Sequence, residues 1–310
     1  MSLLLPRKGA EIAEDASRED AAFAEERDAE QMEKALEDIG ELPEDWQDFV
    51  LGRIESQKVA ARRRSDEDRK TLDEVFDKST LLVLYKFINN GYLETLDYPV
   101  STGKEANVFH ATTPQGDSVA VKIFRTNTAT FRSFMTYIAG DPRFGHVKPN
   151  RRDIVYVWAQ KEYKNLQRYF EAGVRVPNPI AWRENVLIME FIGDEGTPAP
   201  RVKDAPFDDP AKAYEALVDQ YRLGSERGGL VHGDFSEFNI LNQGNAPVVI
   251  DVAQAVLSHH PMAAELLARD AKNLAAYFRR QGVKVTADET LKRITPPRKE
   301  REPIGRDEEE

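Results

Sequence analysis

The 310-residue sequence predicts an α+β protein of two lobes, a sheet-rich lobe followed by a smaller helical one. Three observations support this fold class. Runs of β-branched and aromatic residues at 108–110 and 119–124 flank the turn-forming stretch 113–116, which is typical of a β-hairpin. Beyond residue 210 the apolar residues recur mostly at helical spacing. Between these parts, residues 193–210 are rich in Pro, Gly and Asp and indicate a linker.

The remaining elements follow from the spacing of apolar residues along the chain. An amphipathic pattern over 71–90 predicts a helix that ends at Asn90 and Gly91, a common stop signal. The spacing then predicts a helix over 153–172 and a buried strand over 186–191. After the linker we expect a helix over 211–226, a small hairpin with strands at 240–241 and 248–250, and a last helix over 261–281.

These elements divide the chain into three regions. Residues 71–285 are expected to form the folded domain, with the sheet-rich lobe at about 71–192 and the helical lobe at about 193–285. Residues 1–70 are expected to form an acidic extension that is helical and in part disordered. Residues 286–310 are expected to be a charged tail.

The net charge of −11 comes from one end of the chain. Residues 1–50 hold 16 acidic and 5 basic residues, whereas the rest carries 38 of each. An acidic extension repels phosphate backbones, which argues against nucleic-acid binding at that end. A solvated helix or a disordered arm is the simpler interpretation of this charge.

The composition excludes several classes of protein. A hydrophobic fraction of 41% is enough for a core. No apolar run reaches the roughly 18 residues that a membrane span needs, so no membrane association is expected. The absence of cysteine excludes disulfides and thiolate metal sites. It fits a reducing compartment, and we expect a cytoplasmic location.

The pattern richest in chemistry lies at 232–251. Asp234 and Asn239 are five residues apart in the string His-Gly-Asp-Phe-Ser-Glu-Phe-Asn, and Asp251 lies twelve residues further on, behind an apolar run. One carboxylate can orient an attacking hydroxyl or accept its proton. An amide and a second carboxylate offer the hard oxygens that Mg²⁺ prefers. Polar turns also give this spacing by chance, so the flanking residues carry the assignment.

Lys122 lies in the string Val-Ala-Val-Lys-Ile, among β-branched residues. Its ammonium must either extend to water from an edge strand or pair with an anion, because burial without a partner is costly. Glu162 is a candidate partner, since it lies in a segment where Trp158 and Leu166 recur at helical spacing. A solvated glutamate is the alternative.

A polar string, Ser-Thr-Gly-Lys-Glu-Ala-Asn at 101–107, precedes the first strand of the predicted hairpin. Its amides and hydroxyls are suited to contact phosphates. It has neither the three glycines of a kinase lid nor the pattern of a Walker motif. On the residues alone, a simple polar turn is an equally good interpretation.

Taken in order, these motifs resemble the RIO family of atypical serine/threonine protein kinases, in its first (type-one) branch and an archaeal-like form. They cover roughly residues 71–282. The resemblance implies a two-lobed protein-kinase-like fold with a sheet-rich N-lobe and a reduced helical C-lobe. It rests on Ser-Thr-Gly-Lys-Glu-Ala-Asn-Val-Phe, Val-Lys-Ile-Phe, Trp-x-x-Lys-Glu-Tyr-x-Asn-Leu, Leu-Ile-Met-Glu-Phe-Ile-Gly, His-Gly-Asp-Phe-Ser-Glu-Phe-Asn and Ile-Asp-Val-Ala-Gln.

The resemblance also implies a role for each motif in binding ATP and Mg²⁺, with Mn²⁺ as an alternative metal. Asp234 would be the catalytic aspartate, Lys122 would hold the phosphates, and Glu162 would position Lys122. Asn239 and Asp251 would bind the metal. The hinge and lid residues that would contact the nucleotide are Met189, Glu190, Ile192, Ser101, Lys104, Glu105 and Asn107.

Members of the family are described as phosphorylating serine and as ATPases in small-ribosomal-subunit maturation. The implied partners are therefore ATP, the small ribosomal subunit or its precursor, and a protein substrate. Two departures from ordinary kinases qualify this implication. Gly233 stands where those kinases have arginine, so no control through a phosphorylated activation loop is expected. No Ala-Pro-Glu string follows Asp251, so the peptide-binding part of the C-lobe is expected to be missing.

Two other functions remain open on the sequence. Small-molecule kinases of the aminoglycoside and choline type share His-Gly-Asp-x4-Asn, but they need an extended helical pocket, for which little chain remains after Asp251. An ATP-switched assembly factor would use the same site to control docking rather than signalling. The missing peptide platform favours that second alternative.

A long segment separates Lys122 from Glu162. Its stretch 141–152 is basic and holds no Ser, Thr or Tyr. We expect this stretch to contact phosphate groups on RNA or on a partner, unless it is only a solvated loop. The residues concerned are Arg143, Lys148, Arg151 and Arg152.

Overall fold

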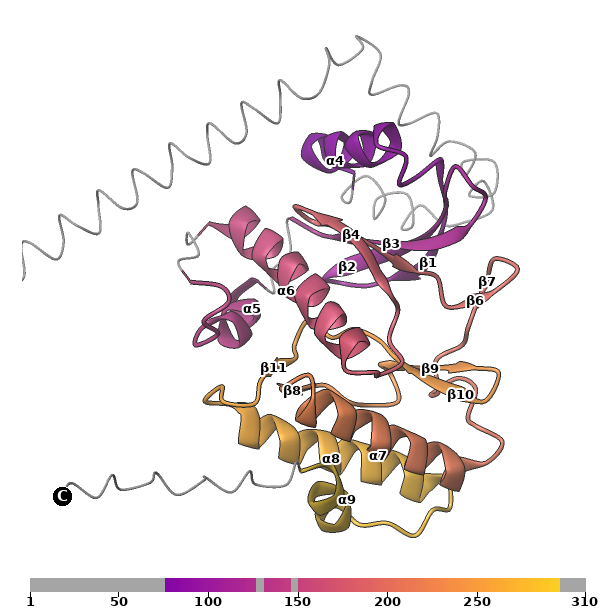
Figure 1. The fold of residues 1–310 in the computed structure, drawn as a ribbon, viewed down its shortest axis with the longest axis vertical. Helices are drawn as coiled ribbons and strands as arrows, with labels where there is room; N and C mark the ends of the chain where they lie inside the picture. Colours follow the sequence, from indigo (N-terminus) through magenta and orange to yellow (C-terminus); the bar gives the residue numbers. More distant parts are fainter. Residues whose placement is uncertain (1–75, 127–130, 146–149, 296–310) are drawn as a thin grey trace, which may run out of the picture. The chain divides into compact units, whose positions relative to one another are not determined.

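The computed structural model describes residues 76–126, 131–145 and 150–295 (Figure 1). All of them belong to one compact unit of the chain. The acidic extension expected at 1–70 lies outside the described residues, as does 296–310 of the expected tail.

A five-stranded antiparallel sheet dominates the first lobe (Figure 1). Its strands lie in the order β1-β2-β3-β5-β4. The predicted hairpin is confirmed, because β2 and β3 pair along their whole length, with Val108 opposite Lys122. The strands are β1 (Thr95–Thr102), β2 (Ala106–Thr112), β3 (Ser118–Phe124), β4 (Pro179–Arg183) and β5 (Val186–Glu190).

Three described helices belong to this lobe: α4 (Lys78–Asn89), α5 (Phe131–Ile138) and α6 (Arg151–Glu171). Helix α4 begins after Asp77, whose carboxylate accepts a hydrogen bond from the Thr80 amide at 2.8 Å. Asn150 caps α6 in the same way. Helices α4 and α6 lie on opposite faces of the sheet, and α6 is on the side of the second lobe (Figure 1). The long helix can therefore contact both lobes.

The second lobe consists of helices and short strand pairs (Figure 1). The predicted small hairpin is confirmed as β9 and β10, which pair in antiparallel register. The helices are α7 (Pro210–Glu226), α8 (Ala263–Arg280) and α9 (Ala287–Ile294). The strand pairs are β6 (Gly193–Asp194) with β7 (Thr197–Pro198), β8 (Leu230–Val231) with β11 (Val256–Leu257), and β9 (Ile240–Gln243) with β10 (Ala246–Val249).

Several elements differ from the sequence prediction. Strands β1 and β4 and helix α5 were not predicted, and the expected linker contains the β6–β7 hairpin. Helix α9 lies where a charged tail was expected from residue 286. Thr286 and Glu289 form a capping box at its start, and Ile294 is fully buried at its end. The folded lobe therefore continues past the expected boundary at 285.

One hydrophobic cluster contains residues of both lobes. Its largest members include Trp158 on α6, Tyr214 on α7 and Phe278 on α8. Phe134 of α5 stacks on Trp158 with ring centroids 4.4 Å apart, which fixes α5 against α6. Because the two lobes share this core, the elements on either side of the space between them are held in a fixed arrangement.

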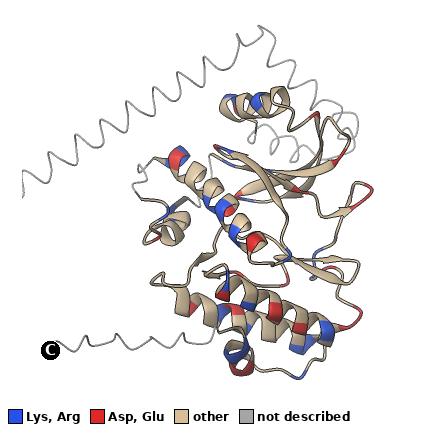
Figure 2. Cartoon of the chain, in the orientation of Figure 1, with Lys and Arg blue, Asp and Glu red and all other residues tan. Residues whose placement is uncertain are grey.

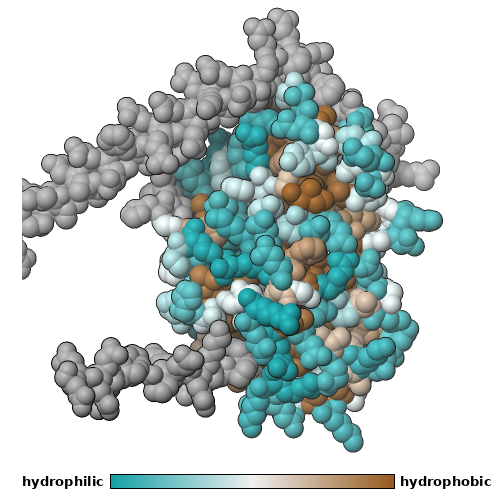
Figure 3. Space-filling model, in the orientation of Figure 1, coloured by the Kyte–Doolittle hydropathy of each residue, from teal (hydrophilic) through white to brown (hydrophobic). Residues whose placement is uncertain are grey.

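The surface is polar and of mixed charge. In Figure 3 the described part of the visible face is mainly hydrophilic, with hydrophobic residues in smaller areas. Figure 2 shows acidic and basic residues interspersed on α6, α7 and α8, which agrees with the balanced charge of residues 51–310. Within the described ranges, no helix is both long enough and apolar enough to cross a membrane.

Candidate active site

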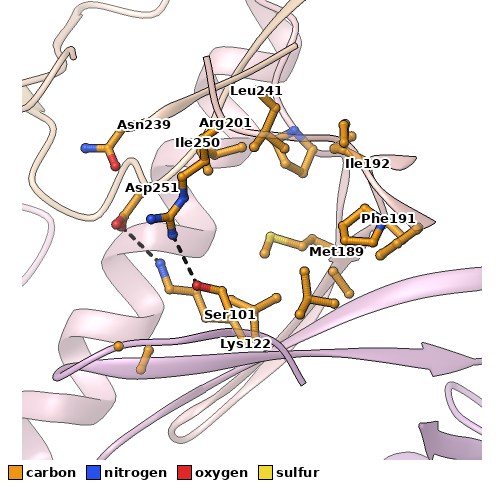
Figure 4. Close-up of a pocket in the computed structure, with 18 of the residues that line it drawn as sticks. Ser101, Lys122, Met189, Phe191, Ile192, Arg201, Asn239, Leu241, Ile250 and Asp251 are labelled. Carbon is orange, nitrogen blue, oxygen red and sulfur yellow. Dashed lines mark hydrogen bonds and ion pairs between the residues drawn. The ribbon is translucent and has the colours of Figure 1, made fainter. Parts of the chain in front are cut away.

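A cavity of about 720 Å³ lies between the sheet and the second lobe. Figure 4 shows Lys122 and Asp251 directed toward each other on one side, with Met189, Phe191 and Ile192 grouped on the other. The cavity therefore has a charged end and an apolar end. That combination suits a ligand with a planar apolar part and a charged part.

The charged end is organised around Lys122. Its Nζ lies 2.8 and 2.7 Å from the two carboxylate oxygens of Glu162, and 3.0 Å from Oδ1 of Asp251. Strand β3 directs Lys122 into the cavity because alternate residues of a strand share a face, and Ala120 and Phe124 line the same cavity. The structure thus brings together three residues that the sequence placed 40 and 129 positions apart.

Burial and charge shift the ionisation of this trio. Burial acts against the ammonium of Lys122, but the carboxylates of Asp251 and Glu162 outweigh it and raise the pKa of Lys122. Burial raises the pKa of Glu162, whose side chain is 1% exposed. Desolvation acts against ionisation of Asp251, yet the Lys122 ammonium holds the pKa of that carboxyl below its usual range. Lys122 and Asp251 are therefore both charged at neutral pH.

Asp251 follows β10 and has a backbone φ of 58°, in the left-handed region that non-glycine residues seldom adopt. The amide of Ile250 donates to the Asn239 carbonyl at 3.0 Å, which ties this turn to the loop before β9. The side chain of Asp251 is 51% exposed. Its carboxylate is thus fixed in direction and still accessible from the cavity.

The loop 232–239 presents Asp234 and Asn239. The Asn239 side-chain amide donates to the Asp234 carboxylate and to the Asp234 main-chain carbonyl, each at 2.9 Å. Asn239 lines the cavity, whereas Asp234 is not among the lining residues and reaches it through Asn239. The two side chains predicted to act together are therefore in direct contact.

The buried carboxylate of Asp270, on α8, holds this loop in place. Asp270 accepts hydrogen bonds from the amides of Gly233 at 2.7 Å and Phe235 at 2.9 Å, and from the Tyr221 hydroxyl at 2.7 Å. Burial raises the pKa of Asp270, although these donors oppose the shift. Gly233 has a φ of 80°, which suits glycine. The two amides flanking Asp234 are thereby fixed.

The predicted lid residues divide between two faces of the sheet. Ser101, Lys104 and Glu105 line the cavity. Asn107 does not: it is fully buried and accepts a hydrogen bond from Arg125 at 3.2 Å. The reason is that side chains alternate between the two faces of β2: Ala106 and Val108 line the cavity, and Asn107 between them faces the other way. The expectation that Asn107 contacts a nucleotide is therefore corrected.

The predicted hinge residues Met189, Glu190 and Ile192 all line the cavity. The Glu190 carboxylate is engaged by Arg175, with two contacts of 2.7 Å. Its side chain therefore serves to hold the hinge rather than to meet a ligand directly.

Sequence reasoning missed three functional candidates. Asp270 and Arg201 lie in segments without a recognisable motif, and only the fold brings them to the site. Lys161, which precedes Glu162, was given no role by the sequence, yet it is fully buried and donates to the carbonyls of Ala253 and Ala255. Its place in a helix among buried aromatic residues was the available signal.

The antiparallel sheet, the lysine–glutamate pair on β3 and α6, and the Asp234–Asn239 and Asp251 loops together define a protein-kinase-like fold and site. Comparison with known proteins specifies the class further. The family model of the RIO domain matches residues 107–291.

Curated relatives agree. The RIO-type serine/threonine-protein kinase Rio1 of Haloferax volcanii is 40% identical over 81% of this chain and 90% of its own length. Rio1 of Methanocaldococcus jannaschii is 38% identical over 89% of this chain and 94% of its own length. The chain therefore belongs to the RIO family of serine/threonine protein kinases.

Solved structures support the fold. The crystal structure of the Rio2 kinase from Chaetomium thermophilum matches with a TM-score of 0.53 and 25% identity, over 69% of this chain and 67% of that one. A second crystal structure of that kinase, an ADP/Mg²⁺-phosphoaspartate complex, has a TM-score of 0.54 at 18% identity and covers 84% of this chain and 88% of that one. The expected two-lobed kinase-like fold is confirmed.

Proposed function

We propose that this protein is an ATP- and Mg²⁺-dependent serine/threonine kinase and ATPase, with its active site in the cavity between the lobes. The observation that carries the proposal is the position of Lys122 between Glu162 and Asp251 at the charged end. Glu162 holds the ammonium in place, and the phosphates of ATP take over the contact that Asp251 now makes. The adenine occupies the apolar end beside Met189 and Ile192.

The donor set fits Mg²⁺. The candidate ligands are the amide oxygen of Asn239 and the accessible carboxylate of Asp251. Across the described residues, no group of three or more His, Cys, Asp or Glu could hold a metal ion by itself. Mg²⁺ is commonly bound by one or two protein oxygens together with substrate phosphates, so two ligands suffice here. The bound ion neutralises phosphate charge, and Mn²⁺ is the alternative.

Asp234 is the proposed catalytic aspartate. Its carboxylate is held by the Asn239 amide at 2.9 Å, and the amides around it are held by Asp270. In that position it can orient the attacking hydroxyl or accept its proton. The proposed lid over the phosphates consists of Ser101, near the end of β1, and of Lys104 and Glu105 on the β1–β2 turn.

The proposed setting is the cytoplasm, in maturation of the small ribosomal subunit, with ATP state controlling attachment to the particle. This proposal rests on family membership. The RIO family match disfavours a small-molecule kinase.

The test compares three variants in ATP binding and phosphotransfer. Asp234→Ala should lose phosphotransfer by about 10²–10⁴-fold and keep ATP affinity, because it removes a proton-accepting or orienting group. Lys122→Ala should lose both, because it removes a charge-assisted phosphate contact. Asp219→Ala, a change of an exposed carboxylate on α7, is the matched control and should lose neither.

Normal phosphotransfer by Asp234→Ala would overturn the proposed mechanism. The proposed setting has a separate test, cosedimentation of the ATP-bound and ATP-free protein with small ribosomal subunits from its own host. Absence of association in both states would overturn the ribosomal role, and equal association in both would overturn its control by ATP; either result leaves the kinase assignment intact.

A further inference from the structure

Arg201 lies on a segment that is fixed against the catalytic loop. The amide of Asn242 donates to the Pro200 carbonyl at 2.8 Å, and the amide of Val202 donates to the Ile240 carbonyl at 2.9 Å. Arg201 itself forms an isolated β-bridge with Leu241. The main chain of Arg201 is therefore held beside β9, directly after the Asn239 loop.

The side chain of Arg201 enters the cavity and reaches the other lobe. Its Nη2 donates to the Ser101 hydroxyl at 3.1 Å, across the cavity (Figure 4). Ser101 lies near the end of β1, next to the β1–β2 turn. A cation from the second lobe thus meets a neutral hydroxyl from the first.

The other charges around the cavity are mostly paired. Glu162 and Asp251 hold Lys122, Arg175 holds Glu190, and the pair formed by Lys203 and Asp204 has an N–O distance of 3.3 Å. Among the ion pairs of the described residues, none involves Arg201, which is half-buried. Withdrawing a guanidinium from water without an anion costs free energy. An anionic ligand in the cavity would remove that cost.

Arg201 is also close to the proposed metal ligand. Desolvation acts to raise the pKa of Asp251, and the lowering that outweighs it comes mainly from Lys122, then from His232, with a smaller contribution from the charge of Arg201. Among the ion pairs of the described residues, Asp251 is joined to Lys122 and not to Arg201, so the Arg201 guanidinium has no carboxylate partner. In Figure 4 the Arg201 guanidinium lies beside Lys122 and Asp251 at the charged end of the cavity, with Met189, Phe191 and Ile192 on the other side.

We propose that Arg201 is a second phosphate-binding cation of this site, which reaches the nucleotide's phosphates from the second lobe, beside Lys122, and gives up its hydrogen bond to Ser101 when it binds them. This inference rests on the proposed function, because it assumes that a nucleotide occupies the cavity. Arginine suits the task, since its planar fork can donate two hydrogen bonds to one phosphate.

The test is a ligand series measured by titration calorimetry on the full chain with Mg²⁺. Adenosine, AMP, ADP and ATP are compared between the wild type, Arg201→Met, Arg201→Lys and Arg222→Met. Arg222 is the matched control, an exposed arginine on α7 that pairs with Glu226. We expect Arg201→Met to weaken ATP binding about 10- to 100-fold, as for a hydrogen bond to a charged group, and to leave adenosine binding within about twofold. The ATP affinity of Arg201→Lys should lie between those of Arg201→Met and the wild type, and the ATP affinity of Arg222→Met should equal that of the wild type.

The step of the series at which the loss begins identifies the phosphate that Arg201 contacts. Unchanged ATP affinity in Arg201→Met would overturn the inference, and so would an equal loss for adenosine and ATP. Lys122→Met separates this failure from that of the proposed function. If Lys122→Met weakens ATP binding and Arg201→Met does not, only the role of Arg201 is wrong. If the wild type binds no nucleotide, the proposed function itself fails.

Discussion

Lys161 and Glu162 are consecutive buried residues of α6, and they hold two different parts of the active site. Glu162 contacts Lys122 of β3 at 2.7 Å. Lys161 donates to the carbonyls of Ala253 and Ala255, which follow Asp251. One turn of helix therefore fixes both the phosphate-binding lysine and the segment that carries the proposed metal ligand. A shift of α6 would change both at once.

The first prediction concerns the pH dependence of stability. Burial lowers the pKa of Lys161 to about 7, whereas the unfolded side chain titrates near 10.4. Between these values the unfolded state binds more protons, so the contribution of Lys161 to stability rises with pH by up to about 1.4 kcal/mol per pH unit. Lys161→Met should lack this rise in urea unfolding between pH 7 and pH 9.5.

Lys164→Met is the control for this prediction, because Lys164 lies on the same helix and is only half-buried. Its unfolding free energy should follow the wild type across the pH range. Parallel curves for Lys161→Met and the wild type would show that Lys161 does not change its protonation on folding.

The local motifs could be predicted from the sequence, but the residues from distant parts of the chain that hold them in place could not. Asp234, Asn239 and Asp251 were recognisable because a short loop and a hairpin place them, so their spacing is encoded within 18 residues. Asp270 contacts Gly233 from 37 positions away, and Arg201 reaches Ser101 across 100. Such contacts depend on how α8 and β9 pack, which no local pattern specifies.

The errors have equally specific causes. Asn107 was assigned to the lid by the family resemblance, together with the rest of its string, yet it lies in β2, where alternate side chains face opposite ways. Strand β1 escaped prediction because Asp97 and Pro99 interrupt its apolar pattern and its pairing shows two register shifts. Helix α9 was missed because it is short and buries few apolar residues, although its capping box is visible in the sequence.

The second prediction concerns Asp270 as a positioning residue. Asp270→Asn keeps the shape of the side chain. It replaces one of the two carboxylate oxygens, which accept hydrogen bonds from the Gly233 and Phe235 amides, with an NH2 group that can only donate. We expect a loss of about 1.5–3 kcal/mol in the free energy of unfolding. Phosphotransfer should also fall by at least about tenfold at constant ATP affinity, because Asp234 would lose its orientation.

Glu265→Gln on the same helix is the control, since Glu265 is exposed. It should change neither quantity. A variant Asp270→Asn that loses stability but keeps the full rate of phosphotransfer would assign Asp270 a purely structural role.

The third prediction concerns Arg143, for which the structure changes the expectation made for the basic stretch 141–152. Arg143 was expected to contact external phosphate, but its side chain is 13% exposed and forms an ion pair with the buried Asp141 at 2.7 Å. It also donates to Asn165 on α6 at 2.9 Å. The Asn165 amide in turn donates to the carbonyls of Val252 and Ala255. Arg143 therefore stabilises, through Asn165, the segment that follows Asp251. Lys148 of the same stretch lies outside the described residues.

Arg143→Ala should accordingly lower the free energy of unfolding by about 3–5 kcal/mol, because it leaves the Asp141 carboxylate buried without its partner. Arg152→Ala, which changes an exposed arginine at the start of α6, is the control and should stay within about 0.5 kcal/mol of the wild type. Wild-type stability of Arg143→Ala, together with a flatter salt dependence of particle or RNA binding, would restore the original expectation.

The last prediction concerns the metal. Mg²⁺ and ATP together should raise the melting temperature more than ATP alone, because a ligand that binds only the folded state stabilises it by mass action, about 2.7 kcal/mol at a hundredfold excess over Kd. Asp251→Asn should abolish the part of the shift that depends on Mg²⁺, since an amide is a weaker ligand for this cation than a carboxylate. The part due to ATP alone should persist, because Lys122 remains in place and loses one competing carboxylate.

Asp219→Asn, on the exposed side of α7, should reproduce both parts of the wild-type shift and so exclude a general effect of removing one negative charge. The same titration with Mn²⁺ tests the alternative metal at the same ligands. Because the Lys122 ammonium lowers the pKa of Asp251, the carboxylate stays ionised below the usual range, and the Mg²⁺ effect should persist in mildly acidic buffer. A full Mg²⁺-dependent shift in Asp251→Asn would mean that other groups hold the metal, and the role assigned to Asp251 would then be wrong.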